Sequence, residues 1–332
     1  MNMKQWFLSS SGEKRGKAFP ILSFPCVQLL GVTVRQLISD SDLQSQGMKA
    51  ITDRCDTLAS VSLMDLSVEA QAFGSTIKTD DHEVPTVVGS IISTLSDAES
   101  LRVPRVGEGR TGLYIESLKK AADMITDRPV FAGMIGPFSL AGRLMDMTDI
   151  MINCFEQPEM VHLTLRKATE FLIEYGRGYK LTGASGVIMA EPAAGLLSPG
   201  LIDEFSTPYV KEIAGALKSD SFAFVYHNCG NTIPLIDSIK KIDADAYHFG
   251  NAVELAELLS LVPENMVIMG NVDPAGQLRS GTPQSVYDET KRVLDSCDYH
   301  PGFIISSGCD VPPRAPWSNI DSFFRAVKDF YY

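Results

Sequence analysis

The chain has 332 residues, a formal net charge of −12 at pH 7 and a hydrophobic content of 45%. No stripe of lysine and arginine provides the basic surface that a nucleic-acid-binding protein needs, and no apolar run reaches the roughly 20 residues that span a bilayer. The opening segment also lacks the apolar centre of a signal peptide, so we expect a globular cytoplasmic enzyme that binds neither nucleic acid nor membrane.

Eight short β-rich runs are predicted to be strands. In chain order they are Phe19–Phe24, Ser60–Asp65, Pro129–Met134, Gly186–Ala190, Phe222–His227, Ala246–Phe249, Val267–Gly270 and Phe303–Ser306. Helical patterns separate most of them, which is typical of parallel βα units. Closure of eight such strands predicts an α/β fold of the (β/α)8 TIM-barrel type, with residues 1–332 in a single domain.

Prolines mark the start of several predicted helices. Pro158 and Glu159 suit a first helical turn, where a missing N–H and a negative charge are both tolerated. Ser198-Pro199 and Thr282-Pro283 begin two further helices in the same way. A shorter helical pattern around Met3–Leu8 precedes the first strand, and we expect it to form a cap at the bottom of the barrel.

The pair His227 and Cys229 stands at the end of the fifth predicted strand. In barrels of this type the active site lies at the carboxyl ends of the strands. Side chains two residues apart on a strand point to the same side, so both residues should continue an inward row that begins with Ala223 and Val225. We expect the pair to face the mouth of the barrel.

A similar row is predicted on the last strand, where Phe303, Ile305, Ser307 and Cys309 alternate. The two rows could converge across the barrel mouth. An imidazole and two thiolates favour zinc over magnesium or calcium, and three protein ligands leave a fourth position open for catalysis. Such a site carries no net charge, so it can deprotonate an incoming thiol and still leave it electron-rich. That chemistry suits a thiolate that attacks a methyl group.

A plainer interpretation of these residues stands beside this one. A buried cysteine is usually a small hydrophobic residue, and one His-x-Cys pair can arise by chance. The four other cysteines, Cys26, Cys55, Cys154 and Cys297, are interpreted as structural. Disulfides are not expected, because reduced thiols are the default in an intracellular chain.

Six segments resemble the uroporphyrinogen decarboxylase superfamily and, within it, the methylcobamide:thiol methyltransferases, including the methylcobamide:coenzyme M methyltransferases. They are M-D-L-S-V-E-A-Q-A-F-G at 64–74, G-P-F-S-L-A-G at 136–142, E-P-A-A-G-L-L-S-P at 191–199, H-N-C-G at 227–230, M-G-N-V-D-P at 269–274 and S-S-G-C-D-V-P-P at 306–313. The His-x-Cys pair with the late G-C-D-V-P-P is the most specific combination. M-G-N-V-D-P and G-P-F are shared more widely and support the fold more than the activity.

The resemblance implies a zinc-dependent methyltransferase. Its zinc ligands by position are His227, Cys229 and Cys309, and the metal binds the acceptor thiol, such as coenzyme M. A partner corrinoid protein supplies the methyl group as methylcobalamin, which the thiolate attacks in line. Glu191 and Asp273 would be carboxylates at the mouth, and Asp65 falls where the decarboxylases keep their catalytic aspartate.

Several of these residues keep a second interpretation. Asp65 and Glu69 either form a functional pair or are rim acids, solvated or paired with arginine. The turn 136–138 either presents backbone N–H groups to an anion or is a packing turn. Glu191 ends an apolar strand, where a buried charge needs a partner. The orientation of His248 is not determined by the sequence.

Three functions remain open at this point. The first is methyl transfer between a corrinoid protein and a small thiol. The second keeps the zinc but uses a methoxylated or methylamino compound, homocysteine or folate. The third is a decarboxylase-like protein that binds a tetrapyrrole without methyl transfer. Uroporphyrinogen decarboxylase itself is disfavoured, because its M-R-Q-A-G-R segment is reduced here to Val34-Arg35-Gln36, which we place within a helix.

Overall fold

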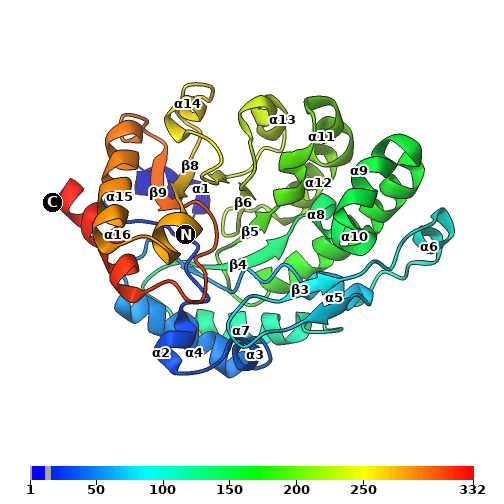
Figure 1. The fold of residues 1–332 in the computed structure, drawn as a ribbon, viewed down its shortest axis with the longest axis horizontal. Coiled ribbons are helices and arrows are strands. Elements are labelled where there is room, and N and C mark those ends of the chain that lie inside the picture. Colours follow the sequence, from blue (N-terminus) through cyan, green and yellow to red (C-terminus); the bar gives the residue numbers. More distant parts are fainter. Residues whose placement is uncertain (1, 12–15) are drawn as a thin grey trace.

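The computed structural model describes residues 2–11 and 16–332. Within them the main sheet has seven parallel strands in the order β1-β4-β5-β6-β7-β8-β9, and helices form a ring around it (Figure 1). The strands are β1 (Ser60–Val61), β4 (Val130–Ile135), β5 (Gly186–Ala190), β6 (Ala223–Asn228), β7 (Ala246–Phe249), β8 (Ile268–Val272) and β9 (Phe303–Ser307). The result is an α/β fold with a curled parallel sheet.

The helices of the ring and its connections vary widely in length. They are α1 (Met3–Ser11), α2 (Cys26–Leu30), α3 (Val34–Leu37), α4 (Ser41–Arg54), α5 (Val68–Phe73), α6 (Leu95–Ser100), α7 (Thr111–Met124), α8 (Pro137–Met145), α9 (Met147–Glu156), α10 (Pro158–Lys180), α11 (Pro199–Phe205), α12 (Thr207–Leu217), α13 (Ile236–Lys240), α14 (Leu255–Leu259), α15 (Pro283–Cys297) and α16 (Trp317–Tyr331). Shorter helical turns are η1 (Pro192–Leu196), η2 (Ile233–Leu235) and η3 (Pro274–Arg279).

The predicted strand Phe19–Phe24 is wrong. This segment is extended but is not a strand, because Pro20 lacks the N–H that a continuous ladder requires. It still occupies the gap between the two edge strands of the sheet. The N–H of Phe19 donates to the carbonyl of Ile305 at 2.9 Å, and the carbonyl of Ala18 accepts from the N–H of Leu58 at 2.8 Å. The sheet therefore has seven strands instead of eight, with this segment between β9 and β1.

The remaining predicted strands are present. The bounds of β5 and β7 agree with the prediction, β9 is one residue longer at its end, and β4, β6 and β8 differ by one or two residues at each end. The run Ser60–Asp65 shortens to the two residues of β1. A small antiparallel hairpin of β2 (Thr76–Lys78) and β3 (Thr86–Val88) was not predicted.

An inner core fills the curled sheet. Ala223 and Val225 belong to it, as predicted for β6. On β9 the predicted inward row is wrong, because Ile304 faces this core while Phe303 and Ile305 pack in the outer cluster with the helices. Cys309 lies beyond β9, where the chain bends, so strand alternation does not determine its direction.

The predicted helix starts are confirmed. Helix α10 begins at Pro158, α11 follows Ser198, and α15 follows Thr282, whose hydroxyl accepts from the N–H of Ser285 in a capping box. The short pattern around Val34 lies in α3, also as predicted.

The predicted N-terminal helix is part of α1. Met3 and Phe7 pack into the inner core, and the N–H of Met3 donates to the carbonyl of Asp220 just before β6, at 2.7 Å. That α1 caps the bottom of the sheet stays a prediction. None of the helices in the described ranges is long and apolar enough to cross a membrane.

An aromatic cluster at the centre of the inner core provides a test of the packing. The ring of Phe131 lies 5.2 Å from that of Phe19 and 6.0 Å from that of Phe7. We expect Phe131→Ala to lower the free energy of unfolding by about 3–5 kcal/mol, since it leaves a cavity in a closed core. Urea denaturation measures this. Phe155 is 73% exposed, so Phe155→Ala should change stability by only about 0.5 kcal/mol. Equal effects of the two changes would contradict this account of the core.

Candidate metal centre

The structure brings His227, Cys229 and Cys309 together at the carboxyl end of the sheet. His227 is the penultimate residue of β6, Cys229 directly follows that strand, and Cys309 comes two residues after β9. One ligand atom from each side chain lies within 4.8 Å of the other two. The Sγ of Cys309 is 3.5 Å from Nε2 of His227. Among the histidine, cysteine, aspartate and glutamate side chains of the described residues, these three lie close enough together to hold a metal ion.

The donor set fits zinc. One imidazole and two sulfurs are ligands that zinc prefers, and three of them match a catalytic site. His227 is buried, whereas both cysteines are half-buried. A hydrogen bond with Cys309 lowers the pKa of Cys229 to about 4, and the same contact raises the pKa of Cys309 well above its usual value. The two sulfurs therefore share one proton, which a metal ion would displace.

The ring of His248 points inward and contacts His227, at the ring nitrogen that does not face Cys309. Its Nδ1 lies 2.8 Å from Nδ1 of His227. Burial, together with the neighbouring imidazole, holds the pKa of His248 well below its usual value. The orientation that the sequence did not determine is thus toward the barrel interior, and His248 is a neutral neighbour of His227.

A cavity of about 370 Å³ opens beside Cys309. Arg143, from α8, and Arg279, from η3, line it together with Asp65 and Asp310. Arg279 forms an ion pair with Glu83 at 2.7 Å. Burial alone shifts the pKa of Arg143, downward, with no contribution from a nearby carboxylate of the described residues. The cavity therefore offers one guanidinium group to a ligand.

Asp65 is paired with arginine, as one of its two interpretations proposed. Its Oδ2 accepts from Nη1 of Arg110 and from the hydroxyl of Tyr114, the latter at 2.8 Å. Ser67 donates its hydroxyl to Oδ1 at 2.5 Å. These contacts hold Asp65 in place at the wall of the cavity.

Glu69 is buried close to Asp65 but has different surroundings. Its Oε1 accepts from the N–H of Ile135 at 3.1 Å, whereas Oε2 has no hydrogen-bond partner. Burial raises the pKa of Glu69 to about 8, so the side chain is a neutral acid at pH 7. No hydrogen bond joins the carboxyl groups of Glu69 and Asp65. The negative charge of Asp65 adds to the rise in the pKa of Glu69.

Glu191 binds the start of helix α8. Its Oε1 accepts from the N–H of Ser139 at 2.5 Å and from the hydroxyl of the same residue at 2.6 Å, and Oε2 accepts from the N–H of Phe138 at 3.2 Å. Of the turn 136–138, only the N–H of Phe138 reaches this side chain, and the N–H of Gly136 donates to the carbonyl of Ala190. That the turn binds an anionic ligand stays a prediction. Burial still raises the pKa of Glu191 to about 7. Its catalytic role stays a prediction.

Asp273 binds the start of a helical turn in a similar way. Its Oδ1 accepts from the N–H of Ala275 at 2.8 Å and of Gly276 at 2.9 Å, which caps η3. A catalytic role of Asp273 likewise stays a prediction. Asp310, which is half-buried next to Cys309, accepts from the hydroxyl of Ser23 at 3.1 Å, and desolvation of its carboxyl raises its pKa.

The four other cysteines are not part of this group of candidate metal ligands. Burial raises the pKa of Cys26 and Cys55 to about 12 and that of Cys154 and Cys297 to about 11. Thiols of this kind stay protonated and are inert. Their surroundings agree with the structural interpretation.

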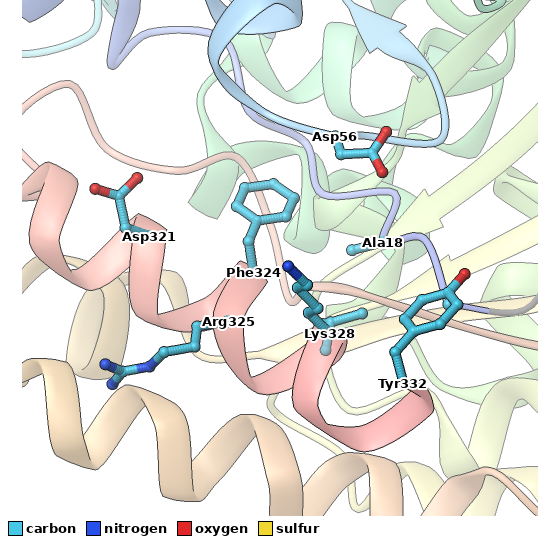
Figure 2. A pocket seen from close by; sticks show the side chains of 9 residues that line it. Ala18, Asp56, Asp321, Phe324, Arg325, Lys328 and Tyr332 are labelled. Carbon is cyan, nitrogen blue, oxygen red and sulfur yellow. The ribbon is translucent and has the colours of Figure 1, made fainter.

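A larger cavity, of about 600 Å³, lies at the opposite end of the sheet. Figure 2 shows Phe324 and Lys328 of α16 facing Asp56, which precedes β1, and Ala18. Tyr332 closes one side. None of the candidate metal ligands lines this cavity, so its size does not make it the functional site.

Sequence reasoning missed the residues that surround the metal centre. Arg143 could have been found, because it is the one charged residue of α8, an otherwise apolar helix that begins in the G-P-F motif. Arg110 and Tyr114 belong to a region in which no motif was recognised. Their contact with Asp65 joins residues 45 and 49 positions apart, which local patterns do not reveal.

Known proteins resemble the chain over most of its length. A model of the family "Uroporphyrinogen decarboxylase (URO-D)" matches residues 24–330. The methylcobamide:CoM methyltransferase MtbA of Methanosarcina acetivorans is 30% identical over 274 residues, which are 81% of this chain and 78% of that protein. A methylated-thiol–coenzyme M methyltransferase of Methanosarcina mazei is 26% identical over 87% of this chain and 77% of its own length.

The fold has a counterpart among solved structures. A methyltransferase from Methanosarcina mazei superposes with a TM-score of 0.88 at 20% identity, and the match covers 100% of both chains. At 20% sequence identity, this structural similarity is evidence for a shared fold and not for a shared activity. It includes the curled parallel sheet on which the candidate metal centre is built.

The buried acid Glu69 should make stability depend on pH. Its pKa rises from 4.5 in the unfolded chain to about 8 in the folded one, so the folded state binds the proton more tightly. The free energy of unfolding should therefore fall as the pH rises from about 4.5 to about 8. Glu69→Gln should remove this contribution, and urea denaturation of metal-free protein at pH 5 and pH 8.5 measures it.

The difference between the two proteins isolates Glu69, because Glu191 and the cysteines titrate in both. Wild type should lose more stability than Glu69→Gln between the two pH values. An identical loss in both proteins would show that Glu69 is charged in the folded state.

Proposed function

The chain belongs to the uroporphyrinogen decarboxylase family, in the branch that contains the methylcobamide:coenzyme M methyltransferases, and from this premise we propose that it transfers a methyl group between a corrinoid and a small thiol. The observation that carries the proposal is the convergence of His227, Cys229 and Cys309 beside a cavity. In this proposal the three residues hold a zinc ion.

The charges of the proposed ligands suit a thiol substrate. Two thiolates and a neutral imidazole balance the two positive charges of zinc, so the site is formally neutral. Zinc in such a site lowers the pKa of a bound thiol and leaves its sulfur electron-rich. Cys309 lines the cavity and both cysteines are half-buried, whereas His227 is buried. We propose that the acceptor reaches the metal from the cavity, past Cys309.

The proposed reaction is a displacement at the methyl carbon. The acceptor thiol loses its proton to solvent, and a lone pair of the resulting thiolate forms the new sulfur–carbon bond. The carbon–cobalt bond of the methylated corrinoid breaks with both electrons on cobalt, which passes from Co(III) to Co(I). We propose that a separate corrinoid protein presents this substrate, as the names of the methylcobamide-dependent relatives suggest.

The cavity favours an acceptor with a negative charge. Arg143 lines it without a carboxylate partner among the described residues, and Arg279 lines it as well. Guanidinium groups bind planar and tetrahedral anions through paired hydrogen bonds. Coenzyme M carries a sulfonate two carbons from its thiol and matches this arrangement, and both groups of relatives are named for it.

Two arginines, Arg35 and Arg110, give the decarboxylase alternative no support. Arg35, the remnant of the decarboxylase motif, donates to Asp81 at 2.9 Å and to Thr79 at 2.7 Å on the exposed surface. Arg110 is paired with Asp65. Neither is free to bind the carboxylates of a tetrapyrrole.

Zinc content tests the ligand assignment. Purified wild-type protein should contain about one zinc per chain, and Cys309→Ser or Cys229→Ser should lose most of it, because a hydroxyl is a poor zinc ligand. Elemental analysis after dialysis against a weak chelator measures this. Cys154→Ser is the matched control, since Cys154 is buried in α9 away from the centre. Full zinc in all four proteins would refute the assignment.

Methylcobalamin demethylation tests the activity and the acceptor. Loss of the methyl–cobalt absorbance should be faster with coenzyme M than with homocysteine or neutral 2-mercaptoethanol. Arg143→Ala should raise the KM for coenzyme M by about 10- to 100-fold, as expected for one lost hydrogen bond to a charged group. It should affect 2-mercaptoethanol much less, and Arg143→Lys should restore part of the loss. Equal effects on the two thiols would exclude Arg143 from anion binding.

A further inference from the structure

A chain of hydrogen bonds extends from the rear of the candidate metal centre to the N-terminal segment. Nδ1 of His227 lies 2.8 Å from Nδ1 of His248, and Nε2 of His248 lies 2.7 Å from the hydroxyl oxygen of Ser306. That hydroxyl in turn donates to the carbonyl of Phe19 at 2.7 Å. The chain thus joins β6, β7, β9 and the extended segment that fills the gap in the sheet.

The acceptor at the end of this chain determines the direction of every bond in it. A carbonyl oxygen can only accept, so the hydroxyl of Ser306 must donate its single proton to Phe19. The hydroxyl oxygen must then accept from Nε2–H of His248. A neutral His248 with its proton on Nε2 has a lone pair on Nδ1, which accepts from Nδ1–H of His227.

A second contact leads independently to the same proton on His227. The backbone carbonyl of His248 lies 3.2 Å from Nδ1 of His227. Since this oxygen can only accept, Nδ1 of His227 must be the donor. If His227 carried its proton on Nε2, its Nδ1 would have no proton to donate. The lone pairs of the His248 carbonyl oxygen and of His248 Nδ1 would then both face the lone pair of that nitrogen.

Burial makes this arrangement selective. The side chains of His248 and Ser306 are fully buried, and His227 is 1% exposed. A group buried to this extent has little access to water, so a lost hydrogen bond is not replaced at low cost. The alternative tautomers therefore carry a penalty that they would not have on the surface.

We propose that His248 and Ser306 are positioning residues that fix His227 in the tautomer with Nδ1 protonated and Nε2 free to bind the metal. Nε2 is the nitrogen that faces Sγ of Cys309, at 3.5 Å. Metal-binding histidines commonly donate their second nitrogen to a carboxylate or carbonyl. Here a neutral imidazole takes that place and adds no negative charge to a site with two thiolates. The inference rests on the proposed function for the identity of the metal.

Nitrogen NMR of histidine-labelled protein tests the tautomers directly. The chain has five histidines, so their ring resonances can be separated and assigned by substitution. In metal-free wild type we expect His227 with a protonated Nδ1 and an unprotonated Nε2, and His248 with a protonated Nε2. A protonated Nε2 on His227 would overturn the proposal. The tautomers are read from the wild-type protein, so the result does not depend on enzymatic activity.

Zinc affinity tests the consequence. Chelator competition should show zinc binding weakened by about 10- to 100-fold in Ser306→Ala and His248→Leu, the range typical of residues that orient a metal ligand. His248→Asn retains an acceptor near the Nδ1 position and should recover part of the affinity. Ser62→Ala is the matched control, because Ser62 is a buried serine whose oxygen accepts from the N–H of Gly133, outside this chain.

The outcomes separate this inference from the proposed function. Zinc affinities of Ser306→Ala and His248→Leu equal to that of Ser62→Ala would overturn the positioning role even if wild type binds zinc and is active. If wild type bound no zinc, the proposed function would fail, and the NMR tautomers would still decide whether the hydrogen-bond chain sets the state of His227.

Discussion

The arrangement on which the rest of the structure depends is the meeting of one imidazole and two sulfurs at the carboxyl end of the sheet. His227 and Cys229 come from β6 and Cys309 from beyond β9, 80 residues later than Cys229. Only the curl of the sheet brings these ends within 4.8 Å of one another. The inner core below them, which includes Phe131 and Val225, keeps the curl rigid, so packing in the core and ligand geometry at the mouth are parts of one constraint.

Three acidic residues around the centre bind neighbouring parts of the chain. Asp65 binds Arg110 and Tyr114, Glu191 binds the start of α8, and Asp273 binds the start of η3. Each carboxylate is satisfied by groups of the chain itself. Of the two arginines that line the cavity, Arg279 is paired with Glu83, whereas Arg143 has no carboxylate partner among the described residues. The proposed preference of the cavity for anions rests on Arg143.

Much of the fold and the metal-binding triad could be predicted from the sequence, because strand runs, proline-marked helix starts and a His-x-Cys pair are local signals. The failures have physical reasons. Pro20 prevents the first segment from forming a ladder, although it lies where a strand would lie. The alternation assumed for β9 is reversed, since Ser306 and not Ser307 reaches His248. Residues such as Tyr114 and His248 act through contacts between distant elements, which no local pattern contains.

The central claim is that this triad binds zinc and leaves room for the sulfur of a substrate. X-ray absorption at the zinc edge of the purified protein measures both. Before a thiol is added, the account predicts two sulfur ligands at about 2.3 Å and at least one nitrogen at about 2.0–2.1 Å. Addition of coenzyme M should raise the number of sulfur ligands to three. A shell of nitrogen and oxygen alone, or a sulfur count that does not change with the thiol, would contradict it.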